Sequence, residues 1–173
     1  MKNGLTTIET DSSKALAKTK SIFSLKNKLI PKRRDEIVDD SWIERLWEWA
    51  DENDISELEK SDYKEEWLGI PRDKEKLLNL TKLSLKDNQL TELPKEIGNL
   101  TNLTQLSLYH NKLTELPKEI GNLTNLTQLD LGDNQLTELP KEIVNLTNLT
   151  WLSLYYNKLT ELPKEIGNLT NLT

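Results

Sequence analysis

The second half of the chain repeats one pattern of apolar and polar positions every 23 residues. The pattern is Leu-x-x-Leu-x-Leu-x-x-Asn-x-Leu-x-x-Leu-Pro-x-x-Ile-x-x-Leu-x-Asn, and it begins at Leu80, Leu103, Leu126 and Leu149. A fifth copy starts at Leu172. Within one copy the leucines are spaced by three, two, five and three residues, which fits neither a helix nor a long strand. The spacing indicates a chain that turns repeatedly toward a shared interior.

The Leu-x-Leu core of each copy has the period of two expected of a short strand with one buried face. A single copy cannot bury its apolar residues alone, so the copies must stack and their strands must pair in parallel. An asparagine follows each strand, and a buried amide there needs hydrogen-bonding partners, so we expect a ladder of side chains bonded to the backbone of neighbouring copies. Each proline fixes φ where the chain swings to the opposite side. The asparagines are Asn88, Asn111, Asn134 and Asn157, and the prolines are Pro94, Pro117, Pro140 and Pro163.

These framework positions resemble the leucine-rich repeat family, within it the 23-residue subclass with Leu-Pro-x-x-Ile found in bacterial and Ras-related leucine-rich proteins. The resemblance covers residues 77–173, and all four full copies match it. It implies an α/β-type solenoid, a superhelix with a concave parallel β-sheet of short strands and an irregular or 3-10 convex side. Many functions use this fold, so the resemblance names no particular partner.

Residues 41–76 are predicted to form a helical N-terminal cap. In the segment SWIERLWEWA, Ser41 and Glu44 have the spacing of a capping box. The residues that follow supply an apolar stripe at helical spacing. A solenoid needs a polar-faced cover over its first repeat, and we expect this helix to provide it together with Trp67, Leu68 and Ile70. The alternative for the tryptophan cluster is a ligand-binding platform. The stripe consists of Trp42, Ile43, Leu46, Trp47, Trp49 and Ala50.

The net charge of −6 is distributed unevenly along the chain. Residues 1–34 carry nine Lys or Arg and two acidic residues, a net charge of +7, whereas residues 35–76 carry sixteen acidic and six basic residues, a net charge of −10. Residues 1–40 are therefore predicted to be a basic, disordered tail. A contact of this tail with nucleic acid or with an anionic membrane is the alternative.

Catalytic and metal-binding chemistry has no candidate constellation in the sequence. There is no cysteine and only one histidine, His110, so we expect no enzyme, no cofactor, no metal site and no small-molecule substrate. The N-terminus lacks a signal-peptide core, and no apolar run approaches membrane-spanning length. We expect a cytoplasmic protein of bacterial origin, with a secreted effector as the alternative.

Variation among the repeats is concentrated on the outward strand positions. The repeats that begin at Leu103 and Leu149 differ only at Gln105 versus Trp151 and at His110 versus Tyr156. Aromatic residues are enriched at binding hot spots, which favours a partner-binding concave face over drift after duplication. The candidate contact residues are Lys82, Ser84, Lys86, Gln105, Tyr109, His110, Gln128, Asp130, Asp133, Trp151, Ser153, Tyr155 and Tyr156.

The predicted function is a protein–protein interaction module or scaffold that binds a protein partner through the concave face. One alternative is the recognition arm of a larger signalling or effector protein whose catalytic part is outside this chain. The second is binding of nucleic acid or anionic membrane by the basic tail. Because the last repeat has no cover, end-to-end self-association is a further expectation.

Overall fold

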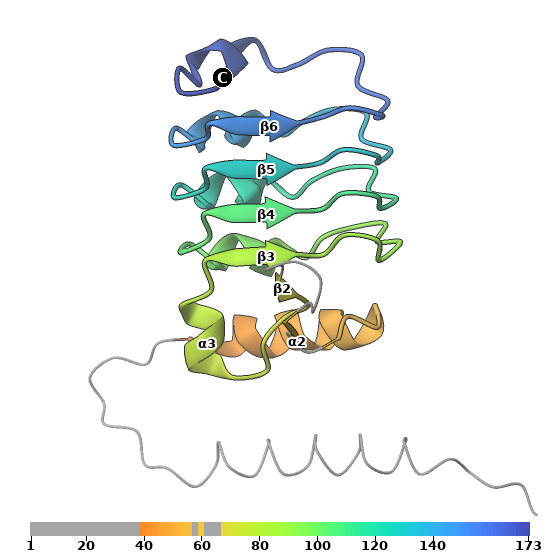
Figure 1. The fold of residues 1–173 in the computed structure, drawn as a ribbon, viewed down its shortest axis with the longest axis vertical. Helices are drawn as coiled ribbons and strands as arrows, with labels where there is room; N and C mark the ends of the chain where they lie inside the picture. Colours follow the sequence, from red (N-terminus) through yellow and green to blue (C-terminus); the bar gives the residue numbers. More distant parts are fainter. Residues whose placement is uncertain (1–38, 57–58, 61–66) are drawn as a thin grey trace, which may run out of the picture. The chain divides into compact units, whose positions relative to one another are not determined.

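The computed structural model describes residues 39–56, 59–60 and 67–173, so the predicted tail lies almost entirely outside the described residues. Residues 40–173 form one compact unit. Its sheet has the order β1-β2-β3-β4-β5-β6. The repeats supply β3 (Lys82–Ser84), β4 (Gln105–Ser107), β5 (Gln128–Asp130) and β6 (Trp151–Ser153), which stack one above another in Figure 1. Two short strands precede them, β1 (Glu59–Lys60) and β2 (Trp67–Leu68).

The repeat strands pair in parallel and in register with the 23-residue period. Leu83 lies beside Leu106, and Leu106 lies beside Leu129. Each residue therefore neighbours its equivalents in the repeats before and after it. β2 extends this parallel sheet past the first repeat, and β1 pairs with β2 antiparallel.

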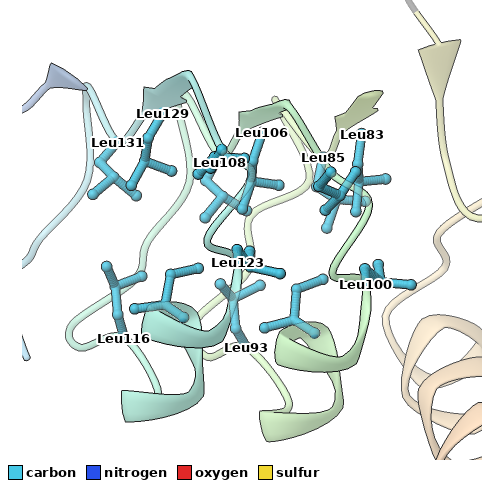
Figure 2. Close-up of a cluster of buried hydrophobic side chains, with 14 of the residues drawn as sticks. Leu83, Leu85, Leu93, Leu100, Leu106, Leu108, Leu116, Leu123, Leu129 and Leu131 are labelled. Atoms are coloured by element: carbon cyan, nitrogen blue, oxygen red, sulfur yellow. The ribbon is translucent and has the colours of Figure 1, made fainter. Parts of the chain in front are cut away.

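Opposite the sheet, each repeat forms one short 3-10 helix directly after its proline. The proline residues have φ between −71° and −50°, the range that the pyrrolidine ring imposes. The leucines of the strands point toward the leucines of this turn side, as Figure 2 shows for Leu83 and Leu106 facing Leu93 and Leu116. The helices are η1 (Lys95–Asn99), η2 (Lys118–Asn122), η3 (Lys141–Asn145) and η4 (Lys164–Asn168).

The predicted asparagine ladder is confirmed for three of its four residues, whereas Asn88 of the first repeat donates to the carbonyl oxygen of Lys86 in its own repeat at 3.0 Å. The Asn134 Nδ2 donates to the carbonyl oxygen of Leu108 in the preceding repeat at 2.9 Å, and its Oδ1 accepts from the amide of Leu113 at 3.1 Å. Asn111 and Asn157 bond in the same way to the repeats before them. Each amide thus satisfies backbone groups that leucine burial removes from water.

A second and a third ladder come from the Asn-Leu-Thr motif that precedes each strand. The Asn125 Nδ2 donates to the carbonyl oxygen of Thr101 at 2.9 Å, and the Thr127 Oγ1 donates to that of Thr104 at 2.9 Å. The same bonds recur one repeat earlier and one repeat later. The motif therefore joins successive repeats along the edge where each strand begins.

The predicted N-terminal cap is present as α2 (Ser41–Glu52). Ile43, Leu46 and Ala50 are buried in the same apolar cluster as the repeat leucines. The indole Nε1 of Trp47 donates to the carbonyl oxygen of Pro71 at 2.9 Å. Ile70 is fully buried as expected. For Trp67 and Leu68 the structure describes the backbone alone, so the predicted role of their side chains lies outside what it describes.

Two details of the cap differ from the sequence prediction. Ser41 is the first residue of α2, and Asp40 occupies the N-cap position. The Ser41 hydroxyl accepts a hydrogen bond from Arg45 at 2.9 Å, and Asp40 forms an ion pair with Lys74 at the start of α3 (Lys74–Leu78). The cap is also not wholly helical, because β1 and β2 lie within residues 41–76 and continue the sheet.

An ion pair joins the cap to the first repeat. The Nε of Arg45 lies 2.6 Å from Oε1 of Glu96, a buried residue of η1. Burial of the Glu96 side chain tends to raise its pKa, but the hydrogen bond and the charge of Arg45 outweigh burial and hold the pKa below its usual value of 4.5. The cap is thus attached by a charge-assisted hydrogen bond as well as by apolar packing.

The core is less well covered at the fourth repeat. Leu139 of the third repeat is 6% exposed, whereas its equivalent Leu162 is 44% exposed. Leu159 and Ile166 are also only partly buried, although Leu136 and Ile143 are fully buried. Apolar surface is therefore open at this end of the described stack.

We predict that Gly121→Ala destabilises the fold by about 1–3 kcal/mol, the typical effect of overpacking. A Cβ atom at this position would lie 2.4 Å from the backbone carbonyl oxygen of Glu142 in the next repeat. Urea denaturation measures the effect, and Gly167→Ala is the matched control because a Cβ there would have no neighbour within 4 Å. Equal stability of the two variants would contradict this close packing of the 3-10 turns.

We predict that Arg45→Met lowers the free energy of unfolding by about 1–3 kcal/mol at neutral pH, because the Glu96 carboxylate loses its charged donor. A lowered folded-state pKa makes this contribution present above the unfolded value of 4.5, and it is lost as the pH falls through the folded value. Urea denaturation of both proteins from neutral pH to about pH 3 should therefore show a shrinking difference. A difference that stays constant over this range would contradict the pairing.

Candidate functional site

The predicted contact residues lie in columns on the outward face of β3–β6, because the strands are in register. We call this side the sheet face. One column comes from the first residue of each strand, and the next column comes from the third residue. The first consists of Lys82, Gln105, Gln128 and Trp151, and the second consists of Ser84, Ser107, Asp130 and Ser153.

All residues of these two columns except Ser153 line a shallow groove of about 280 Å³. Trp151 is 44% exposed at the fourth-repeat end of the sheet, and Lys82 lies at the first-repeat end. Asp130 supplies a carboxylate between them, and Ser107, which was not among the predicted contacts, also lines the groove. The groove thus offers charged, amide and aromatic groups along one open surface.

The remaining predicted contacts come after the ends of the strands in the sequence, so they are not part of the alternating positions within a strand. At His110, Asp133 and Tyr156 the backbone is left-handed, with φ of 53°, 55° and 52°. Asp87 has the same conformation, with φ of 62°. Aspartate and histidine adopt this region more readily than most residues, whereas a bulky residue such as tyrosine is unusual there. Tyr156 is 80% exposed in this conformation.

Aromatic rings from the second and fourth repeats form a continuous cluster beside the groove. The ring centroids of Tyr109 and Tyr155 are 6.0 Å apart, and those of Tyr155 and Tyr156 are 5.3 Å apart in an edge-to-face arrangement. His110 lies 5.8 Å from Tyr109 by the same measure. We refer to Tyr109, His110, Tyr155 and Tyr156 as the aromatic cluster. Such centroid distances are typical of favourable aromatic pairs.

Gly132 makes this cluster possible, although it was not among the predicted contacts. A Cβ atom at position 132 would lie 2.6 Å from Cε1 and 2.8 Å from Cζ of Tyr155. The phenol of Tyr155 therefore crosses the third repeat over Gly132 and reaches Tyr109 of the second. The equivalent positions carry Lys86, Tyr109 and Tyr155, so a single glycine in an otherwise bulky column was the available signal in the sequence.

Acidic groups surround the aromatic cluster. The Nδ1 of His110 lies 2.5 Å from Oδ1 of Asp87, and its Nε2 lies 3.8 Å from Oδ2 of Asp133. The hydrogen bond to Asp87 raises the pKa of His110 above its usual 6.5, and the charges of Asp133 and Asp87 act in the same direction. His110 therefore lies between carboxylates of the first and third repeats, and both carboxylates favour its protonated form.

Desolvation is the largest cause of a raised pKa at Tyr155. The hydrogen bond with Tyr109 and the negative charges of Asp130 and Asp133 raise it further. Tyr155 thus stays a neutral phenol, and it experiences the field of two carboxylates on the same face.

The prediction that Ser153 is an exposed contact residue is wrong. Ser153 lies on the sheet face but is only 7% exposed, because it is close to Gly132 and Tyr155. Its Oγ would be 3.0 Å from a Cβ at position 132. It therefore has almost no surface for direct contact with a partner.

Within residues 39–56, 59–60 and 67–173, no group of three or more His, Cys, Asp or Glu side chains could hold a metal ion. In the same part of the chain, no helix is long and apolar enough to cross a membrane.

Comparison with protein families agrees with the repeat geometry. A family model described as a leucine-rich repeat region matches residues 103–173, and a model described as leucine-rich repeats in two copies matches residues 78–118. The chain belongs to the leucine-rich repeat family. Domains of this family generally mediate protein–protein interaction, and they are typically non-catalytic binding modules. No curated protein matches the chain significantly.

Two solved structures show similar leucine-rich repeats. One is a leucine-rich repeat protein of Leptospira interrogans, with 44% sequence identity over 60% of this chain and a TM-score of 0.53. The other is an internalin (inlF) of Listeria monocytogenes, with 30% identity over 59% of this chain and a TM-score of 0.49. The matched regions cover 32% and 30% of those two proteins, so the matched part of this chain spans about a third of their length.

We predict that Gly132→Ala separates Tyr155 from Tyr109 without unfolding the protein. The backbone of Gly132 is not left-handed, so alanine fits it, and stability should change by less than about 1 kcal/mol. The new methyl group must instead displace the ring of Tyr155, which removes nuclear Overhauser effects between the two tyrosine rings. Gly167→Ala is the control, and unchanged ring contacts in Gly132→Ala would contradict the role of Gly132.

Proposed function

We propose that this leucine-rich repeat domain binds a protein partner through the sheet face of β3–β6, with the aromatic cluster and Trp151 as its anchor. The observation that carries the proposal is the exposure of large aromatic side chains on one side of the sheet. Trp151, Tyr155 and Tyr156 are 44%, 50% and 80% exposed. Aromatic residues in such positions contribute large contact area at a small cost in side-chain entropy.

The regular framework supports this proposal. In the first three repeats the framework leucines are buried, and Asn111 and Asn134 are buried and hydrogen-bonded. Substitutions there affect stability, whereas outward positions vary without disturbing the stack. The second and fourth repeats differ only at Gln105 versus Trp151 and at His110 versus Tyr156, and all four positions are on or beside the sheet face. Sequence change has thus altered the exposed surface and preserved the core.

The setting of the domain is also a proposal. The similar solved proteins are about three times longer than the matched region, which favours a recognition arm of a longer bacterial protein over a complete scaffold. We also propose that the domain is located in the cytoplasm. The partly covered fourth repeat, with Leu162 exposed, would be covered either by further repeats or by a second copy of the chain.

We predict that the double variant Trp151→Gln, Tyr156→Asp loses the protein partner in affinity capture from the native host, quantified by mass spectrometry. Both new residues occur naturally at the equivalent positions of the third repeat, Gln128 and Asp133, so the fold should be retained. Aspartate also suits the left-handed backbone at position 156 better than tyrosine does.

The matched control for this capture is Lys118→Gln, Lys141→Gln, which changes two exposed residues of η2 and η3 on the turn side. It should retain the partner. A partner that stays bound to a folded sheet-face variant would refute the proposal. A partner lost on deletion of residues 1–34, with binding that weakens steeply in salt, would instead favour the basic tail as the binding element.

A further inference from the structure

The aromatic cluster and its carboxylates have the composition of a cation-binding surface. Asp130 and Asp133 lie near enough to the phenol of Tyr155 to act on it through their charges, and Asp87 lies beside His110. The outward positions of the second, third and fourth repeats contain no lysine or arginine. The neighbouring Lys112 and Lys158 each donate a hydrogen bond to a glutamine, Gln89 at 3.2 Å and Gln135 at 3.0 Å.

His110 shows which kind of group this surface accommodates. Its ring lies between the carboxylates of Asp87 and Asp133 and 5.8 Å from the ring of Tyr109. The protein thus holds an imidazole in one part of the cluster, with an aromatic ring on one side and a carboxylate near each nitrogen. Asp130 and the exposed rings of Tyr155 and Tyr156 are not covered by it.

The shape of the cluster favours a planar cation. The rings of Tyr155 and Tyr156 meet at 73°, so they present a face and an edge at one corner. A guanidinium group can stack on an aromatic face and at the same time donate two hydrogen bonds to one carboxylate, which a compact ammonium group cannot do.

We propose that the three tyrosine rings of the aromatic cluster, with Asp130 and Asp133, bind an arginine side chain in an exposed segment of the protein partner. This inference rests on the proposed function, since it names the chemistry of the partner on the same face. His110 competes with that arginine for Asp133, and the arginine adds the contact with Asp130 and the tyrosine rings that His110 does not make.

The test is a nuclear magnetic resonance titration of the full chain with a blocked Gly-Arg-Gly-Arg-Gly peptide. The same peptide with citrulline in place of arginine is the neutral control of nearly equal shape. The arginine peptide should shift the signals of Tyr109, Asp133, Tyr155 and Tyr156, and the citrulline peptide should bind at least about two-fold more weakly.

Three single variants test the assigned contacts. Asp133→Asn should weaken binding of the arginine peptide about two- to five-fold, the range expected for exposed charge and cation–π contacts. Glu138→Gln makes the same change in net charge at an exposed position in the loop before Pro140, and it should leave the affinity unchanged. His110→Asn removes the internal competitor with a residue that tolerates the left-handed backbone, so it should strengthen binding by a similar factor.

Several results would overturn the inference. These are equal binding of the citrulline peptide, equal weakening by Glu138→Gln, or signal shifts located outside the cluster. Shifts of the cluster by a neutral oligosaccharide, with none by the arginine peptide, would assign the surface to a glycan. If capture of the native partner still requires Trp151 and Tyr156 in any of these cases, the proposed function stands and only the arginine assignment fails.

Discussion

The whole stack depends on hydrogen bonds that cross from one repeat to the next at the asparagines. Burying the strand leucines removes nearby backbone groups from water, and one repeat has no means of pairing all of them. Asn111 joins carbonyl oxygens of Leu85 and Leu108, 23 residues apart, through one amide. Because unpaired buried polar groups are costly, each repeat is held at the same length and in the same register as its neighbours.

That register is also what creates the candidate binding surface. Tyr109 and Tyr155 are separated by one complete repeat, yet their rings are 6.0 Å apart. They meet because every outward column is aligned and because Gly132 has no side chain in the column between them. Because the framework is regular, the lack of a side chain at Gly132 allows a defined contact between the two tyrosine rings. The nearby carboxylates add negative charge beside this contact.

The two ends of the described stack differ in how far their apolar core is covered. At the first repeat, α2 covers the leucines, and Arg45 reaches Glu96 at 2.6 Å. At the fourth repeat the equivalent of buried Leu139 is Leu162, which is 44% exposed. The first repeat is otherwise regular, and a single helix residue, Arg45, pairs with its Glu96. This ion pair distinguishes the first repeat energetically from the others.

The sequence alone determined the architecture, because the leucine, asparagine and proline positions recur with one period and have one way to be buried together. It also located the variable face, although it treated Asp133 and Tyr156 as strand residues and Ser153 as an exposed contact. Only the tertiary structure decided that the former have left-handed backbones, that Ser153 is covered, and that Gly132 brings two distant tyrosines together. These features depend on contacts between residues of different repeats, and the pattern of residue types along the sequence does not specify such contacts.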